Sequence, residues 1–155
     1  NCAILTGTTA SGKSEIALSF ARERGDLELI SADSLAVYRG TDIASAKPTQ
    51  EERSSVPHHL IDVLDPSEDF SAGKFSSLAR SALEDISRRG KKALIVGGTG
   101  FYLKALLRGV WEKTEEADPA LRSELEALDS ESLYQQLESL DPKSAVRIGR
   151  TDRYR

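Results

Sequence analysis

One octet near the start of the chain has the residue types and spacing to bind a phosphate chain. It reads GTTASGKS and fills every fixed position of the pattern G-x-x-x-x-G-K-[ST]. Glycines let backbone N–H groups turn inward, and a following helix adds the positive end of its dipole. Lys13 would pair with terminal phosphate oxygens, and the Ser14 hydroxyl would bind Mg²⁺. The predicted phosphate site consists of Gly7, Thr8, Thr9, Ala10, Ser11, Gly12, Lys13 and Ser14.

Two further groups that could act on a ligand follow other apolar stretches. Asp33 lies in the small polar cluster that ends LELISADS, and Thr99 lies in the turn GGTG after ALIV. The carboxyl ends of parallel strands face the ligand crevice of an open α/β sheet. Asp33 could therefore hold a metal through water or accept a proton, although a helix N-cap or turn residue is an equally good interpretation. The glycines beside Thr99 indicate a backbone that passes close to a ligand.

The hydrophobic pattern predicts the frame that would position these groups. Strands are expected at residues 2–5, 27–34 and 93–96, and helices after residue 14, over 71–90 and from 101. Ser71 is the candidate cap of the second helix, and Gly90 would stop it. Apolar strands that do not alternate with polar residues, separated by helices, are typical of a parallel sheet covered on both faces. We expect an α/β fold.

Between these elements lies a long segment, residues 37–75, with three prolines and little periodicity. Segments of that length are usually functional or flexible. Tyr38, Arg39, Asp42 and Lys47 could guide a substrate there, or they could be solvated loop residues. The adjacent histidines at 58 and 59 point apart and have no Cys or His partners nearby, which favours a loop-stabilising role over metal binding.

The last third of the chain has a different character. Residues 112–155 are polar, charged and rich in regularly spaced leucines, and two Asp-Pro pairs mark helix starts. We therefore predict two parts, an α/β core at 1–111 and part of a helical appendage at 112–155.

Composition narrows the protein class. With 155 residues, 39% hydrophobic and 30% charged, the chain resembles a soluble globular domain and lacks a run that could cross a membrane. The single cysteine suits a cytoplasmic setting, and a net charge of −4 argues against a broad nucleic-acid surface but allows local basic patches. Because the chain does not begin with Met and stops amid positive charge, we expect it to be part of a longer protein.

An ordinary kinase or ATPase is not the first interpretation of the phosphate site. Most P-loop NTPases carry a second strand that ends in a metal-holding Asp. Here the candidate strand ends in GGTG, which contains no carboxylate. A small-molecule or nucleotide kinase nevertheless remains an alternative.

Four motifs in order resemble the tRNA dimethylallyltransferases. They are GTTASGKS, SADSLAVYRGTDIASAKPT, VPHHLIDVLDPSEDFSAGKF and GGTGFYLKALLRG, and DPALR and DPKSAVRIGRTDRYR extend the match over essentially the whole chain. The resemblance implies a P-loop NTPase-like core with a tRNA-binding helical appendage. It also implies transfer of a dimethylallyl group from dimethylallyl diphosphate to N6 of the adenosine 3′ to the tRNA anticodon, with Mg²⁺ as cofactor. A related alternative is prenylation of free adenine nucleotides, which would not need tRNA-binding arginines. We take a monomer as the default assembly.

The same resemblance assigns roles to individual residues. The P-loop would hold the diphosphate, Asp33 would take the proton of the amine, and Thr99 would orient the reacting groups. The implied tRNA contacts are Asp33, Ser34, Leu35, Ala36, Thr99, Arg122, Tyr154 and Arg155. The family usually has glutamine where Ala36 stands, which puts that contact in doubt.

From the residues alone, the arginines of the last third differ as candidates. A lone helical arginine such as Arg122 is more often a solvated charge than a ligand contact. The closing cluster is a better phosphate-binding candidate because it is locally basic in an acidic chain. Its members are Arg147, Arg150, Arg153 and Arg155.

Overall fold

The computed structural model describes residues 2–43, 45–109 and 118–152. Its contacts divide the chain into two compact units, Asn1–Glu112 and Lys113–Arg155. The described parts contain no helix that is long and apolar enough to span a membrane.

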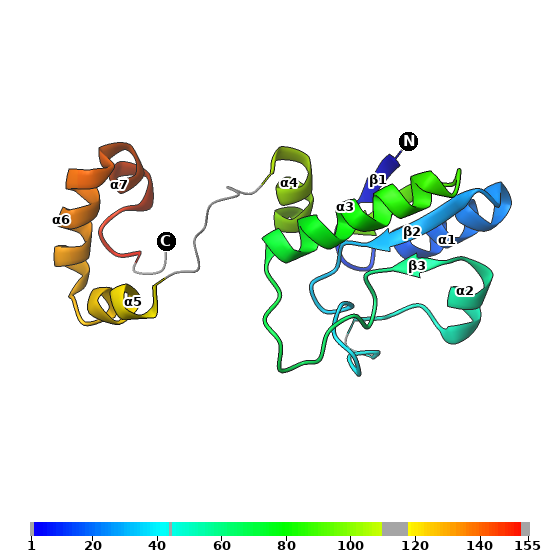
Figure 1. Cartoon of the computed structure of the whole chain (residues 1–155), viewed down its shortest axis with the longest axis horizontal. Helices are drawn as coiled ribbons and strands as arrows, with labels where there is room; N and C mark the ends of the chain where they lie inside the picture. Colours follow the sequence, from blue (N-terminus) through cyan, green and yellow to red (C-terminus); the bar gives the residue numbers. More distant parts are fainter. Residues whose placement is uncertain (1, 44, 110–117, 153–155) are drawn as a thin grey trace. The chain divides into compact units, whose positions relative to one another are not determined.

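The first unit is built on a four-stranded parallel sheet (Figure 1). Its strand order is β1-β4-β2-β3, with bounds β1 Cys2–Thr6, β2 Leu27–Ser31, β3 His58–His59 and β4 Lys92–Gly97. Residue Val96 of β4 is level with Leu5 of β1 and with Ser31 of β2. Because the strands are parallel and in this register, the segments that follow β1, β4 and β2 leave the sheet at the same edge.

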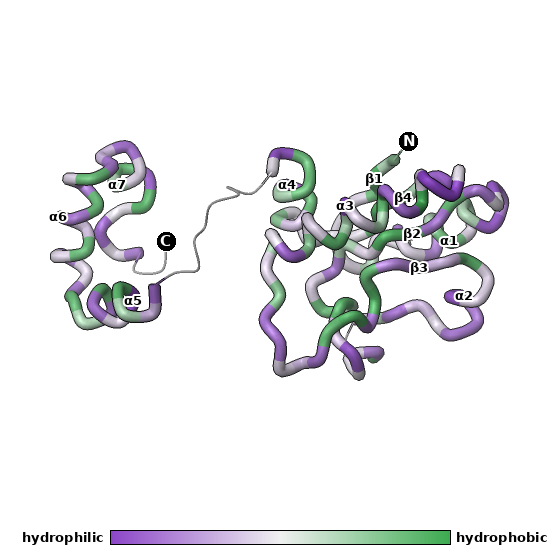
Figure 2. Tube along the Cα trace, viewed as in Figure 1, coloured by the Kyte–Doolittle hydropathy of each residue, from purple (hydrophilic) through white to green (hydrophobic). Residues whose placement is uncertain are grey.

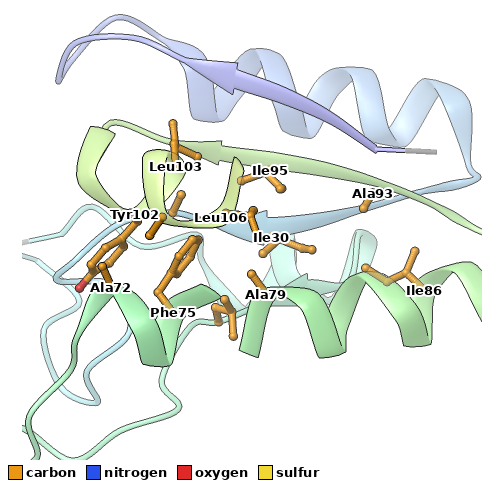
Figure 3. Close-up of a cluster of buried hydrophobic side chains, with 13 residues drawn as sticks. Ile30, Ala72, Phe75, Ala79, Ile86, Ala93, Ile95, Tyr102, Leu103 and Leu106 are labelled. Carbon is orange, nitrogen blue, oxygen red and sulfur yellow. The ribbon is translucent and has the colours of Figure 1, made fainter. Parts of the chain in front are cut away.

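Helices cover both faces of this sheet, which confirms the α/β prediction. Side chains alternate across a strand, so neighbouring residues serve opposite faces. Leu29 of β2 packs in a cluster with α1 (Lys13–Arg24), whereas Ile30 packs with α3 (Ala72–Arg88) and α4 (Gly100–Arg108). Figure 3 shows this second cluster, in which the rings of Phe75 and Tyr102 stack with centroids 4.7 Å apart.

Several element predictions are confirmed and others need correction. Ser71 caps α3 by accepting a hydrogen bond from the Lys74 N–H, as expected. The second strand ends at Ser31 rather than at residue 34, because the chain turns away after Ala32. The long segment also contains two short elements that its weak periodicity did not indicate, β3 and α2 (Gln50–Ser55). β3 consists of two histidines and α2 is hydrophilic (Figure 2), so neither has the apolar residues that gave the other elements their signal.

Within residues 118–152, the second unit contains three short helices, α5 (Pro119–Glu126), α6 (Ser130–Leu140) and α7 (Pro142–Ile148). Each begins after an aspartate whose side chain accepts a backbone N–H of the first turn: Asp118, Asp129 and Asp141. Such caps stabilise a helix start by about 1 kcal/mol. The Asp-Pro pairs therefore mark helix starts, as the sequence predicts.

A buried carboxylate ties the sheet to the end of α3. The Glu28 carboxylate of β2 accepts hydrogen bonds from both terminal guanidinium nitrogens of Arg89. The Nε2 atom of His59 in β3 lies 2.8 Å from the same carboxylate. The hydrogen bonds from Arg89 outweigh the effect of burial and lower the pKa of Glu28 to about 2 from its usual 4.5. This ion cluster joins β2, β3 and the C-terminal end of α3.

Replacing Glu28 by glutamine is expected to destabilise the fold by about 1.5–3 kcal/mol, the range for hydrogen bonds to charged groups. The native pKa is depressed, so the contribution of Glu28 is complete above about pH 4.5 and is lost as the pH falls toward about 2. Urea unfolding at pH 7 and at pH 3 would measure this. A stability difference between wild type and Glu28→Gln that did not shrink at the lower pH would contradict the assignment.

Candidate active site at the carboxyl edge of the sheet

The predicted phosphate loop connects β1 to α1 at this edge. The backbone is left-handed at Gly12, with φ 78°, and at Ala10, with φ 61°, which produces the tight curl between strand and helix. The ammonium of Lys13 donates to the carbonyl oxygen of Thr8 at 3.0 Å, so the lysine lies across its own loop. The remaining loop residues are exposed. A phosphate could therefore reach the loop amides and the Lys13 ammonium together.

The glycine turn after β4 passes directly beside this loop. A Cβ atom placed on Gly98 would lie 3.1 Å from the carbonyl oxygen of Gly7 and 3.9 Å from the Lys13 Nζ. On the other side, a Cβ on Gly97 would lie only 2.2 Å from the carbonyl oxygen of Ala32. The glycines thus allow three backbone segments to meet. The close approach of this backbone to a ligand stays a prediction.

Asp33 lies immediately after the β2 segment that meets these glycines. Its Oδ1 accepts the N–H groups of Leu35, at 2.8 Å, and of Ala36, at 3.1 Å. The turn-residue interpretation is therefore confirmed for one carboxylate oxygen. Among the described residues no hydrogen-bond partner meets the other oxygen, so Asp33 can orient a turn and still accept a proton.

Thr99 and Tyr102, at the start of α4, lie beside the Ala32–Asp33 segment. Burial raises the pKa of the Tyr102 phenol, and the nearby charges of Tyr38 and Asp33 raise it further. The Thr99 N–H donates to the carbonyl oxygen of Ala32 at 3.3 Å. Within the described residues, the Thr99 side chain makes no capping bond to α4, which leaves its hydroxyl for a ligand.

The predicted tRNA contacts in this unit differ in accessibility. Ser34 and Leu35 are exposed in the turn beside Asp33. Ala36 is only 4% exposed, and its N–H and carbonyl are bonded to Asp33 and to the Asp62 N–H, respectively. Its environment is that of a packed residue within the turn.

The other predicted contacts belong to the helical unit. Arg122 forms a 3.0 Å ion pair with Glu126 on the exposed face of α5. Arg150 pairs with Glu131 at 2.7 Å and lies 4.9 Å above the Tyr134 ring. The predicted contacts Tyr154 and Arg155, and the cluster member Arg153, lie outside the described residues.

Two features of this edge were not foreseen from the sequence. A cavity of about 150 Å³ lies between α1 and the 46–61 segment. Its lining combines apolar residues such as Leu18, Leu29 and Val96 with the polar or charged Ser14, Glu15, Ser31, Lys47, Glu52 and His58. The side chain of Lys47 is buried, so the solvated-loop interpretation is wrong for this residue. Neither residue spacing nor hydrophobic periodicity carries a signal for such tertiary contacts.

Comparison with known proteins gives consistent results. The model of the IPP transferase family matches residues 36–155. Over 98% of its length the chain is 47% identical to tRNA dimethylallyltransferase 1 of Citrifermentans bemidjiense, and over 97% it is 46% identical to tRNA dimethylallyltransferase of Deinococcus radiodurans. It covers 49% and 50% of those proteins, so it spans about half their length.

Solved structures show the same similarity. The full-length tRNA isopentenylpyrophosphate transferase from Bacillus halodurans is 40% identical with a TM-score of 0.69, over 99% of this chain and 52% of that one. A eukaryotic dimethylallyltransferase acting on tRNA is 31% identical with a TM-score of 0.87, over 99% of this chain and 39% of that one.

Proposed function

The chain belongs to the IPP transferase family, and on that premise we propose that the protein transfers a dimethylallyl group from dimethylallyl diphosphate to N6 of the adenosine 3′ to the tRNA anticodon. One observation carries the proposal. The phosphate loop, the Asp33 carboxylate and the Thr99 segment meet at one edge of the sheet, and glycines stand where an NTPase would have its metal-holding acid. A cradle for a leaving diphosphate thus lies beside a proton acceptor.

In the proposed reaction the adenine N6 forms a bond to C1 of the allyl group while the C1–O bond to diphosphate breaks. Negative charge gathers on the diphosphate, where Lys13 and the loop amides are placed to stabilise it. The amine loses a proton as it becomes bonded to carbon, and Asp33 would accept it. The Thr99 hydroxyl would orient the amine or a diphosphate oxygen.

Mg²⁺ fits the residues present at the loop. This ion keeps several waters and takes few protein ligands beside substrate phosphates. The exposed Ser14 hydroxyl at the start of α1 offers one such ligand, and the described residues contain no cluster of three or more acidic, His or Cys side chains that would make a protein cage. When bound, the ion would offset charge on the diphosphate.

The cavity beside Ser14 supports the proposed donor. The cavity measures about 150 Å³, and a cavity of roughly that volume can hold a molecule the size of benzene. Its lining combines apolar side chains such as Leu18, Leu29 and Val96 with polar and charged ones. It could therefore take the five-carbon tail of a diphosphate held on the adjacent loop.

The proposed acceptor is tRNA. A stacked base cannot reach a pocket at the sheet edge, so we expect the adenosine to be flipped out. Ser34 and Leu35 are exposed where it would arrive, whereas Ala36 is packed inside and offers no side-chain contact. Arg122, Arg147 and Arg150 of the helical unit are exposed and could bind the phosphate backbone. Because the substrate is tRNA, we place the reaction in the cytoplasm, with a monomer as the simplest assembly.

Mass spectrometry would test this function directly. The full-length protein is incubated with dimethylallyl diphosphate and an anticodon stem-loop, with AMP and with ATP in parallel reactions. We expect the stem-loop to gain one dimethylallyl group. Modification of AMP but not of the RNA would indicate a free-nucleotide prenyltransferase, and phosphoryl transfer from ATP would indicate a kinase.

Replacing Lys13 by alanine is expected to weaken binding of dimethylallyl diphosphate about 10- to 100-fold, since a hydrogen bond to a charged group contributes about 1.5–3 kcal/mol. Calorimetric titration would measure the dissociation constant. Lys91→Ala is the control, because Lys91 lies at the opposite end of β4 and contacts the carbonyl oxygen of Gly25. Equal dissociation constants for Lys13→Ala and wild type would contradict the phosphate-loop assignment.

A further inference from the structure

A buried lysine holds the long segment at three points. The Lys47 side chain is 1% exposed, and its ammonium donates to the carbonyl oxygen of Tyr38 at 2.6 Å, to Asp62 at 2.6 Å and to Asp42 at 3.1 Å. An ammonium has three N–H donors, so these acceptors use all of them. Burial alone would lower the pKa of Lys47, but the two carboxylates outweigh it and raise the pKa, which keeps the group charged.

Of these three acceptors, Asp62 also bonds a second cation. Its second carboxylate oxygen accepts from Arg53 at 2.5 Å, and Arg53 also donates to the Pro48 carbonyl oxygen. The Asp62 backbone is left-handed, with φ 55°, a conformation that Asp and Asn tolerate better than other non-glycine residues. Two cations on its side chain therefore fix both the position and the backbone conformation of Asp62.

Backbone hydrogen bonds connect Asp62 to the turn of the candidate base. The Asp62 N–H donates to the Ala36 carbonyl oxygen at 3.1 Å, and the N–H groups of Val63 and Leu64 donate to that of Val37. The Ala36 N–H in turn donates to Asp33 Oδ1. Three hydrogen bonds, joined through the backbones of Asp62 and Ala36, thus connect the Lys47 ammonium to the Asp33 carboxylate.

We propose that Lys47 is a positioning residue, which through Asp62 holds the turn of residues 34–37 and so orients the Asp33 carboxylate. This inference rests on the proposed function, in which Asp33 accepts the proton of the amine. The Lys47 ammonium has no N–H left to donate to a substrate, because its three donors are already used within the protein. Lys47 does line part of the cavity beside Ser14. Its effect is on the geometry of Asp33, and a displacement of about 1 Å at a reacting group can cost on the order of 100-fold in rate.

The test compares Lys47→Met, which keeps an apolar stem of similar length, with Asp62→Asn and the double variant in the full-length protein. We expect kcat for prenyl transfer to fall about 10- to 100-fold in each single variant. The double variant should fall little further, since both changes break the same contact. The dissociation constant for inorganic diphosphate, which has no prenyl tail to enter the cavity that Lys47 lines, should stay within about twofold of wild type, because the phosphate loop is not part of this contact. Lys91→Met is the control that removes a lysine outside the network.

A second measurement does not depend on catalysis. Amide hydrogen exchange at Leu35 and Ala36, whose N–H groups Asp33 accepts, should speed up in Lys47→Met and stay unchanged in Lys91→Met. Unchanged kcat, or losses of kcat and diphosphate binding that run in parallel with a loss of thermal stability, would overturn the proposal. If the wild-type protein proved inactive on tRNA, the proposed function would fail, while the exchange result would still decide the role of Lys47.

Discussion

Replacing Asp33 by asparagine is expected to reduce prenyl transfer by about 10²–10⁴-fold, the range that a general base contributes. Asparagine has the same shape, and its carbonyl oxygen can accept the Leu35 and Ala36 N–H groups as Asp33 Oδ1 does. The variant therefore keeps the turn and removes the negative charge. Single-turnover mass spectrometry of a prenylated anticodon stem-loop would measure the loss.

The same variant should bind dimethylallyl diphosphate with nearly unchanged affinity. The diphosphate is assigned to the loop amides and Lys13, and the acid is assigned to the amine. Asp33→Ala is the informative companion, because it also removes the turn acceptor and should additionally lower thermal stability. Near wild-type turnover by Asp33→Asn would exclude Asp33 as the base.

Much of the fold could be predicted because the sequence carries two strong local signals. The octet at Gly7–Ser14 has fixed residue types, and the strand and helix around it are apolar at the expected spacing. Position at the end of a parallel strand then placed Asp33 and Thr99 at a common edge, as the structure shows. Ile16 and Phe20 of α1 fit the helical spacing of apolar residues, yet both are exposed in the first unit. Helical spacing alone therefore does not identify the buried side chains.

The remainder of the site depends on contacts between residues distant in sequence. Lys47 and Asp62 are 15 residues apart in a segment without periodicity, and only the fold brings their charges together. Glu28 and Arg89 are likewise 61 residues apart and are brought together only by the fold. In the sequence, one is a residue of a predicted strand and the other lies at the end of a predicted helix. A buried ion pair leaves no pattern in one sequence, because each member alone resembles an ordinary surface charge.

The glycine turn after β4 gives the second large effect. Gly97→Ala is expected to destabilise the protein by about 3 kcal/mol, the upper end for overpacking. The added Cβ would lie 2.2 Å from the Ala32 carbonyl oxygen and 2.5 Å from its carbon, both backbone atoms. The Ala32 backbone cannot easily move away, because two hydrogen bonds hold it. Its N–H donates to the Val96 carbonyl oxygen at 2.8 Å, and its carbonyl oxygen accepts the Thr99 N–H.

Gly100→Ala is the matched control for Gly97→Ala. Apart from its chain neighbours and the backbone of its own helix, no heavy atom of the described residues lies within 4 Å of a Cβ on Gly100, the first residue of α4, so alanine there should stabilise by about 0.4–1 kcal/mol. Urea unfolding at pH 7 compares the two directly. The clash at Gly97 would be relieved by moving Ala32, and with it Asp33 and Thr99, so Gly97→Ala should also lose prenyl transfer in whatever protein remains folded. Stabilities of the two alanine variants that agree within about 0.5 kcal/mol, the usual scatter of surface substitutions, would show that the backbones of β2 and β4 do not meet at Gly97 as the structure has them.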